Sequence, residues 1–118
     1  MELRPSEHTS DSTDPSDVEC PVTRFLRVVG GKWKLLLVMH ISQGTNRFGQ
    51  LQRAIPAISK QMLTTQLREL EADGIVHREI FPVVPPRVEY TLTELGRSLL
   101  PVVGVVREWG IAHGDLAR

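Results

Sequence analysis

The sequence predicts a mainly α-helical domain with one small β-hairpin. Four stretches before residue 74 carry apolar residues at helical spacing, which favours four helices. Two later runs alternate between apolar and polar residues on either side of a proline-rich segment, which is typical of a hairpin. An apolar final stretch predicts a last helix. This order of elements is that of a winged helix-turn-helix fold.

Length and composition set the broad class of the protein. A chain of 118 residues is long enough for one compact domain and too short for two of ordinary size. No apolar run approaches the roughly 20 residues that cross a bilayer, and the N-terminus lacks the apolar segment of a secretory signal. A single cysteine fits a reducing compartment. We therefore expect a cytoplasmic protein that does not contact a membrane.

Acidic and basic residues are separated along the chain, although the formal net charge is zero. Residues 1–19 hold six of the 14 acidic residues and one of the 14 basic residues, so the remainder carries 13 bases and eight acids. We expect residues 1–19 to form a disordered acidic tail, because they contain few large apolar side chains. The basic remainder favours a polyanionic partner, and chance clustering on a solvated surface is the alternative.

The first two expected helices cover residues 21–29 and 32–42. Pro21 suits the first position of a helix, and Gly30 and Gly31 interrupt the apolar pattern after residue 29. A short strand is expected at residues 47–48. The second helix should bury one side, formed by Trp33, Leu36, Leu37 and either His40 or Ile41.

The third and fourth expected helices form the helix-turn-helix pair. The third covers residues 48–55 and ends before Pro56. The fourth begins after Ser59, a good N-cap, and ends at Gly74. One side of the fourth helix is an apolar stripe, which leaves the opposite side free for a partner. The stripe consists of Leu63, Leu67 and Leu70.

The two alternating runs, residues 75–81 and 88–92, predict the hairpin. Thr93 is expected to cap the last helix, and Pro101 is expected to kink it. Apolar residues of this helix cover more than one face, and one small core can cover only one stripe. We therefore predict a homodimer through the first and last helices. The expected interface residues are Val22, Phe25, Leu26, Leu99, Val102, Val103, Val106 and Trp109.

The free side of the fourth helix carries side chains that hydrogen-bond to bases and phosphates. They predict contact with double-stranded DNA, and a two-fold dimer would bind a pseudo-palindromic operator. The candidate residues are Ser59, Lys60, Gln61, Thr64, Thr65 and Arg68. At the wing, Arg87 could enter a minor groove or grip a phosphate, and an ion pair with Glu89 or Glu79 is the alternative. Candidates for further contacts with the DNA backbone are Lys32, Lys34, Arg47 and Arg53.

A series of motifs in this order resembles the HxlR-type winged-helix transcriptional regulators. The motifs are Cys20-Pro21, Gly30-Gly31-Lys32-Trp33, Arg47-Phe48, Leu51, Ile58-Ser59, Met62-Leu63-Thr64, Leu67-Arg68-Glu69-Leu70, Asp73-Gly74, Pro85-Pro86-Arg87-Val88-Glu89-Tyr90 and Leu92-Thr93-Glu94-Leu95-Gly96. They cover about residues 20–113, which leaves residues 114–118 as a C-terminal tail. The resemblance implies a homodimeric DNA-binding regulator whose fourth helix lies in the major groove and whose wing follows the backbone or minor groove. Most members of this family respond to aldehydes, quinones, hypochlorite or disulfide stress.

Cys20 directly precedes the first expected helix, where the helix dipole favours a thiolate. Asp17 and Glu19 oppose that effect. The Cys20-Pro21 pair resembles the sensing cysteine of redox-responsive members of the family, which makes oxidation a candidate signal. The available products are a disulfide between two copies of Cys20, a mixed disulfide with a small thiol, or an adduct with an electrophile. A structural or bystander thiol is the alternative.

No spacing predicts an enzyme, a cofactor or a metal site. The histidines lack ligand spacing, and no set of nucleophile, histidine and acid is evident. Gly30-Gly31-Lys32 lacks the spacing of a phosphate-binding loop. Two other functions remain open. One is a winged-helix regulator gated by a non-covalent small ligand at the dimer interface. The other is a winged-helix module that binds protein, which would have no salt-dependent affinity for a duplex.

Overall fold

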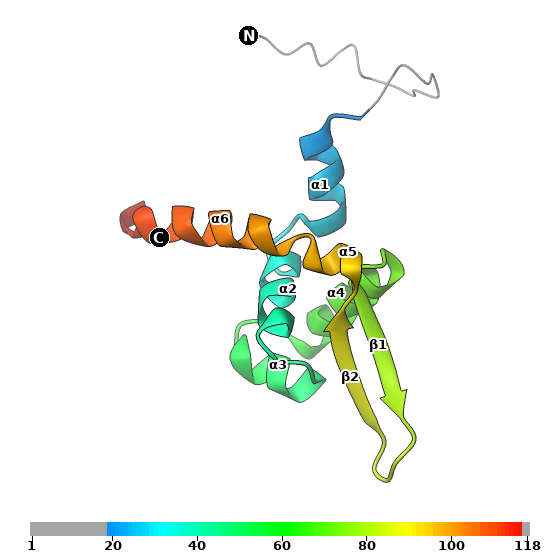
Figure 1. Ribbon diagram of the computed structural model, residues 1–118. Helices are drawn as coiled ribbons and strands as arrows, with labels where there is room; N and C mark the ends of the chain where they lie inside the picture. The colour runs from blue at the N-terminus through cyan, green and yellow to red at the C-terminus, as the bar shows by residue number, and fades with distance from the viewer. Residues whose placement is uncertain (1–18, 117–118) are drawn as a thin grey trace.

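A computed structural model describes residues 19–116, which form six α-helices, one short 3-10 helix and one antiparallel hairpin (Figure 1). The helices are α1 Pro21–Val29, α2 Lys34–Ser42, α3 Phe48–Ala54, α4 Lys60–Ala72, α5 Glu94–Arg97 and α6 Leu100–Ala112, followed by η2 Gly114–Leu116. The strands are β1 Val76–Phe81 and β2 Arg87–Leu92. This architecture confirms the predicted fold class. Of the tail expected at residues 1–19, residues 1–18 lie outside the described residues.

The hydrophobic core lies between α2, α3, α4 and the start of the hairpin. The predicted apolar stripe of α4 is confirmed, because Leu63, Leu67 and Leu70 are all fully buried. Burial of such leucines is worth about 2 kcal/mol each. The other members of the core are Val29, Leu37, Val38, Ile41, Leu51, Ile55, Ile58, Ile75, Val76 and Tyr90.

The buried side of α2 differs in part from the prediction. Leu37 and Ile41 are buried as expected, whereas Trp33, Leu36 and His40 are only half-buried. The structure instead buries Lys34 and Val38. The helix is apolar on several sides, so its periodicity does not tell which side meets the core and which side meets α6.

Both ends of α4 are closed by hydrogen bonds that its sequence predicts. At the start, the Ser59 hydroxyl oxygen accepts a hydrogen bond from the Met62 amide at 3.0 Å. At the end, Gly74 adopts a φ of +75°, which favours glycine. The Ile75 amide then donates to the Leu70 carbonyl at 2.9 Å, and the Gly74 amide donates to Glu71 at 3.0 Å. This pair of bonds is a Schellman motif.

The short strand expected at residues 47–48 is absent from the described structure, where Arg47 is the N-cap of α3. The Gln50 side chain accepts hydrogen bonds from the Asn46 and Arg47 amides, both at 3.2 Å, which favours the start of a helix. The Asn46 carbonyl does accept a bond from the Tyr90 amide at 2.8 Å. One such bond ties this loop to the hairpin without forming a strand.

The expected single last helix, kinked at Pro101, is wrong, because the chain forms two helices. The Thr93 hydroxyl accepts a hydrogen bond from the Gly96 amide at 3.0 Å and caps only the four-residue α5. Pro101 lies in the first turn of α6. A proline lacks the amide hydrogen that an interior helical position needs, and it fits the first turn without loss.

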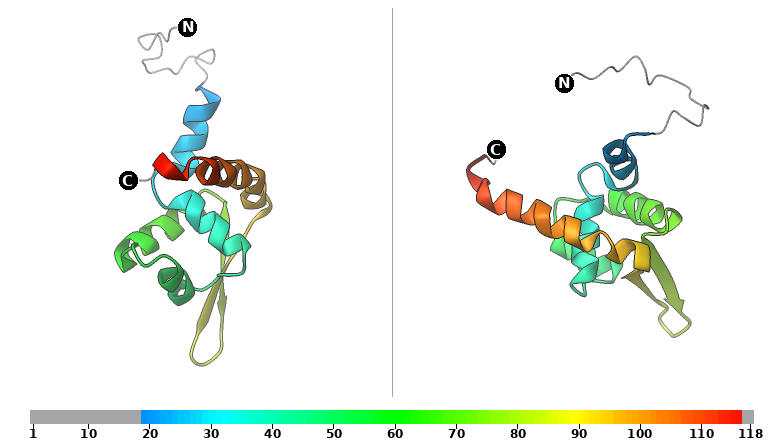
Figure 2. Two further views of the ribbon diagram at one scale, coloured as in Figure 1. Left: turned by 90° about the vertical axis from the view of Figure 1, so that its left-hand side faces the viewer. Right: turned by 45° about the horizontal axis from the view of Figure 1, so that its top comes forward.

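The terminal helices and the hairpin lie at opposite ends of the molecule. Figures 1 and 2 show α1 and α6 at one end and the hairpin pointing away from them at the other. Only Val29 of α1 is buried, and α6 contributes no fully buried residue. Within residues 19–116, no helix combines the length and apolarity that a membrane span requires.

Candidate nucleic-acid interface

The side of α4 opposite the core is open to solvent. Gln61, Thr65 and Arg68 are exposed on this side, and Lys60 is exposed at the N-terminal end of the helix together with its N-cap Ser59. The buried leucine stripe fixes this orientation, since residues half a turn away from the stripe must point outward. The outward side of α4 therefore presents hydroxyl, amide and cationic groups without a covering element.

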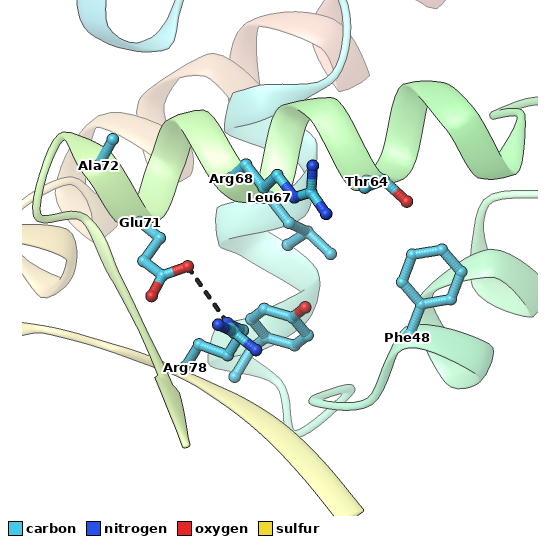
Figure 3. A pocket seen from close by; sticks show the side chains of 8 residues that line it. Phe48, Thr64, Leu67, Arg68, Glu71, Ala72 and Arg78 are labelled. Carbon is cyan, nitrogen blue, oxygen red and sulfur yellow. Dashed lines mark hydrogen bonds and ion pairs between the residues drawn. The ribbon is translucent and has the colours of Figure 1, made fainter. Parts of the chain in front are cut away.

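A hollow of about 620 Å³ separates α4 from the hairpin. Figure 3 shows Thr64 and Arg68 reaching this space from α4 and Arg78 reaching it from β1. The remaining walls are Phe48, Leu67, Glu71, Ala72 and Tyr90. The Thr64 hydroxyl donates to the Lys60 carbonyl at 2.9 Å, so its oxygen stays free to accept.

Arg78 was not among the candidates drawn from the sequence. Its Nε lies 3.3 Å from a carboxylate oxygen of Glu71, the contact drawn as a dashed line in Figure 3. In sequence Arg78 is one polar residue of an alternating strand, and such residues are usually solvated. The hairpin register pairs Arg78 with Tyr90 and so brings it beside α4.

Tyr90 forms the buried wall of the hollow. Burial raises the pKa of its phenol, and nearby Arg78 and Arg68 oppose this effect, whereas Glu71 adds to it. The phenol therefore keeps its proton at neutral pH and can donate a hydrogen bond.

Near the tip of the hairpin, where it pairs with Phe81, Arg87 makes the ion pair that was the alternative to a DNA contact. Its Nε lies 3.1 Å from Glu89, and a guanidinium nitrogen of Arg47 lies 3.7 Å from the same carboxylate oxygen. The Arg87 guanidinium also lies over the Phe81 ring, 4.4 Å from its centre. The Arg87 Nε is shielded from solvent and forms no well-angled hydrogen bond, so the contact with Glu89 is chiefly electrostatic. Both arginines remain partly exposed, and an ion pair of this kind is weak enough to exchange for a phosphate.

The structure does not place Lys34 or Lys32 beside the outward side of α4. Lys34 is only 8% exposed, and its ammonium lies 2.6 Å from the Glu69 carboxylate, so a contact between Lys34 and a duplex is ruled out by burial. Lys32 lies over the Trp33 ring, 4.7 Å from its centre, and borders a groove between α2 and α6. Arg53 is exposed on α3.

Cys20 is exposed at the N-cap position of α1. The backbone amides of Thr23 and Val22 lower the pKa of its thiol, and Glu19 partly opposes them. No capping hydrogen bond of standard geometry joins the sulfur to these amides, so the effect is that of nearby partial charges. Glu19 itself is paired with Arg27 and lies 3.8 Å from Arg24, which reduces its influence on the thiol. Asp17, the other expected opponent, lies outside the described residues.

The expected interface residues divide into two groups. Phe25, Leu99 and Val103 are half-buried against the protomer's own core. The others keep more of their surface uncovered, with Val102 half-buried and Val22, Leu26, Val106 and Trp109 exposed. Val105 and Ile111 of α6 are equally exposed, although they were not among the expected residues.

Comparison with known proteins identifies the family. The model of the HxlR-like helix-turn-helix family matches residues 28–117. The HTH-type transcriptional regulator YybR of Bacillus subtilis is 53% identical over 102 residues, which cover 86% of this chain and 82% of YybR.

Two solved structures of the redox regulator HypR are also similar. The oxidised form has a TM-score of 0.77 at 55% identity and covers 80% of this chain and 97% of its own. The reduced form has a TM-score of 0.78 at 54% identity and covers 82% of this chain and 96% of its own. The chain thus belongs to the HxlR-like helix-turn-helix family and is a DNA-binding transcriptional regulator, not an enzyme.

Proposed function

We propose that this regulator is a homodimer that binds a pseudo-palindromic operator and that modification of Cys20 by oxidants or electrophiles alters its affinity for that operator. The DNA contacts are assigned to Ser59, Lys60, Gln61, Thr64, Thr65 and Arg68 of the α4 region, with Arg87 at the wing and Arg47 at the N-cap of α3. The groove between α2 and α6, where Lys32 lies, belongs to the other end of the molecule. Lys32 is therefore left out of the proposed DNA surface.

The observation that carries the redox part is the position of Cys20. Its thiol is exposed and has a lowered pKa, and it begins α1, a helix whose apolar side chains Val22 and Leu26 are uncovered in the protomer. The similarity to HypR, a redox regulator, supports the same conclusion. A thiolate is the form of cysteine that reacts with oxidants and electrophiles.

In a homodimer, oxidation can join the two copies of Cys20 in a disulfide. With diamide, two Cys20 thiols, one from each protomer, form one S–S bond, and their two protons and two electrons pass to the N=N bond of diamide, which becomes a hydrazine. A disulfide between the two α1 helices would change the spacing of the protomers. Since operator binding requires two α4 helices at a fixed separation, such a change lowers specific affinity.

The experiment is operator binding to the DNA upstream of the regulator's own gene, at two salt concentrations, with reduced and with diamide-treated protein. We expect salt-dependent binding by the reduced protein and altered affinity after diamide. Cys20→Ser should bind like the reduced wild type and should not respond. A response that survives in Cys20→Ser would remove the sensor role.

The pH dependence of alkylation tests the thiolate directly. Because the folded pKa of Cys20 is lowered, the thiolate fraction at neutral pH should exceed that of the same chain unfolded in urea. The rate of alkylation by iodoacetamide should therefore reach its midpoint at a lower pH in the folded protein. Equal midpoints in the folded and unfolded chain would contradict an activated thiol.

A second candidate is gating by a non-covalent apolar ligand. An apolar groove between α2 and α6, with a volume of about 340 Å³, favours it. The groove is lined by Leu35, Leu36, Met39, Val103 and Val106, with Lys32 and Arg107 at the rim. Thermal shifts of Cys20→Ser with a panel of non-reactive apolar compounds distinguish the two mechanisms, since only ligand gating survives the loss of the thiol.

A further inference from the structure

We propose that the hollow between α4 and the hairpin binds a backbone phosphate of the operator and that Arg78 is a DNA-contacting residue. Arg68 and Arg78 hold this phosphate from opposite walls, and Glu71 is the partner that it displaces. The inference rests on the proposed placement of α4 in the major groove, and it adds a residue and a contact that this placement alone does not specify.

The position of the hollow determines its ligand. Major and minor grooves of a duplex are separated by one sugar-phosphate backbone. If α4 lies in the major groove and the wing reaches the adjacent minor groove, that backbone must pass between α4 and the hairpin. The hollow is the space between these two elements (Figure 3), so a phosphate and not a base edge lies against it.

The charges around the hollow favour an anion. Arg68 makes no ion pair with any residue of the described part of the chain, and it is exposed. Arg78 has only Glu71 as a partner there, at 3.3 Å, and their side chains are 40% and 39% exposed. An ion pair this exposed contributes little, so a phosphate can replace the carboxylate at Arg78.

The uncharged groups around the hollow also suit a phosphate. Tyr90 is paired with Arg78 across the hairpin, and its protonated hydroxyl is a donor. The two guanidinium groups come from a helix and a strand of the same folded unit, so the backbone needs no ordering when the phosphate binds. A site of this kind orients α4 in the groove without reading sequence.

Glu71 holds Arg78 at the hollow in the free protein and places a negative charge beside the incoming phosphate. The two members of this ion pair therefore have opposite effects on binding. Loss of Arg78 removes an attraction, whereas loss of Glu71 removes a repulsion and frees Arg78. A purely structural ion pair would give the same sign for both substitutions, because either one breaks it.

The test compares Arg78→Gln, Glu71→Gln and Arg97→Gln in the reduced full-length protein, on the operator and on an unrelated duplex over a range of salt. Arg97 is the matched control: it has the same charge, and it lines a separate hollow bounded by α2, β2 and α6. Thermal melting confirms that each variant is folded.

We expect Arg78→Gln to weaken binding to both duplexes by a similar factor and to reduce the slope of log K against log salt by about one. Glu71→Gln should strengthen binding to both duplexes, and Arg97→Gln should match the wild type. The inference fails if Arg78→Gln equals Arg97→Gln, or if Arg78→Gln and Glu71→Gln both weaken binding. Failure of the proposed function looks different, because the wild type itself would then show no salt-dependent operator binding.

Discussion

Lys34 and Glu69 form an ion pair whose two ends experience different surroundings. The Lys34 side chain is 10% exposed, whereas that of Glu69 is 51% exposed, and the two meet at 2.6 Å. A buried ammonium depends on its partner for the interactions that water would otherwise supply. The half-exposed carboxylate does not, because it can return to solvent. The pair also links the start of α2 to the C-terminal part of α4.

This asymmetry predicts unequal costs for the two substitutions. Glu69→Ala leaves a buried ammonium unpaired and should lower the free energy of unfolding by on the order of 3 kcal/mol. Lys34→Met keeps the buried volume and leaves a hydrated carboxylate, so its cost should be about 1 kcal/mol or less. Urea unfolding at one fixed protein concentration measures both. A larger cost for Lys34→Met would contradict the assignment.

The exposure and contacts of single residues could be predicted only where they depend on the residue's own helix. The exposure of Gln61, Thr65 and Arg68 follows from the leucine stripe of α4, and sequence analysis found all three. Arg78 and Lys34 depend on partners from other elements. Arg78 of β1 meets Glu71 of α4, and Lys34 of α2 meets Glu69 of α4. Spacing along one element carries no information about either contact.

At the scale of elements, the sequence predicts the bounds of α4, which depend on local residues, but not those of α5 and α6, which depend on tertiary contacts. α4 was predicted with both of its ends because Ser59 and Gly74 act on the backbone next to them. The break between α5 and α6 was missed. The apolar pattern continues across it, and α5 ends where Gly96 packs closely against the backbone at the end of α4, a tertiary contact.

Because α5 packs closely on this backbone, adding one methyl group at Gly96 should lower the stability of the protein. A Cβ atom at Gly96 would lie 2.2 Å from the Ile75 carbonyl oxygen, a distance that requires the backbone to move. Gly96→Ala should therefore lower the free energy of unfolding by about 1–3 kcal/mol. At Gly49 in α3, the Cβ would meet only the Arg53 guanidinium at 3.5 Å.

Gly49→Ala is the matched control for this substitution. It adds the same methyl group inside a helix without a clash, and higher helix propensity should raise stability by roughly 0.5–1 kcal/mol. Thermal and urea unfolding of both variants provide the comparison. Equal effects of the two substitutions would show that α5 does not pack against Ile75 as described.

At the scale of the whole molecule, the uncovered apolar surface and the proposed DNA surface lie at opposite ends. Trp109 of α6 is 60% exposed, and Val22 and Leu26 of α1 are also exposed. Figure 2 shows the helices α1 and α6 at the end of the molecule away from the hairpin tip. Exposed apolar patches of this kind mark interaction surfaces. A second copy that covers α1 and α6 would leave both hairpins and both α4 helices free, which is the arrangement that a two-fold operator needs.

A substitution at this surface should break the proposed dimer without touching the proposed DNA contacts. Trp109→Glu places a charge where we expect an apolar interface, so sedimentation should show monomers at concentrations where the wild type is dimeric. Val84→Glu is the control, because Val84 is 98% exposed at the wing tip and should leave the dimer intact. Trp109 is exposed and stacks on His113 of the following turn, with ring centres 4.5 Å apart, so the protomer core should persist.

Loss of the dimer should then alter DNA binding in a specific way. A monomer contacts one half-site, so Trp109→Glu should bind the full operator weakly and with about half the salt slope of the wild type, because about half as many phosphates are contacted. On a duplex that carries a single half-site, the variant and a wild-type protomer make the same contacts, and their affinities should be equal. Weaker binding by Trp109→Glu on the half-site as well would mean that the substitution has damaged α4 or the hairpin. Full operator affinity in a variant shown to be monomeric would mean that each protomer binds DNA independently, and the coupling of Cys20 to the spacing of two α4 helices would have no physical basis.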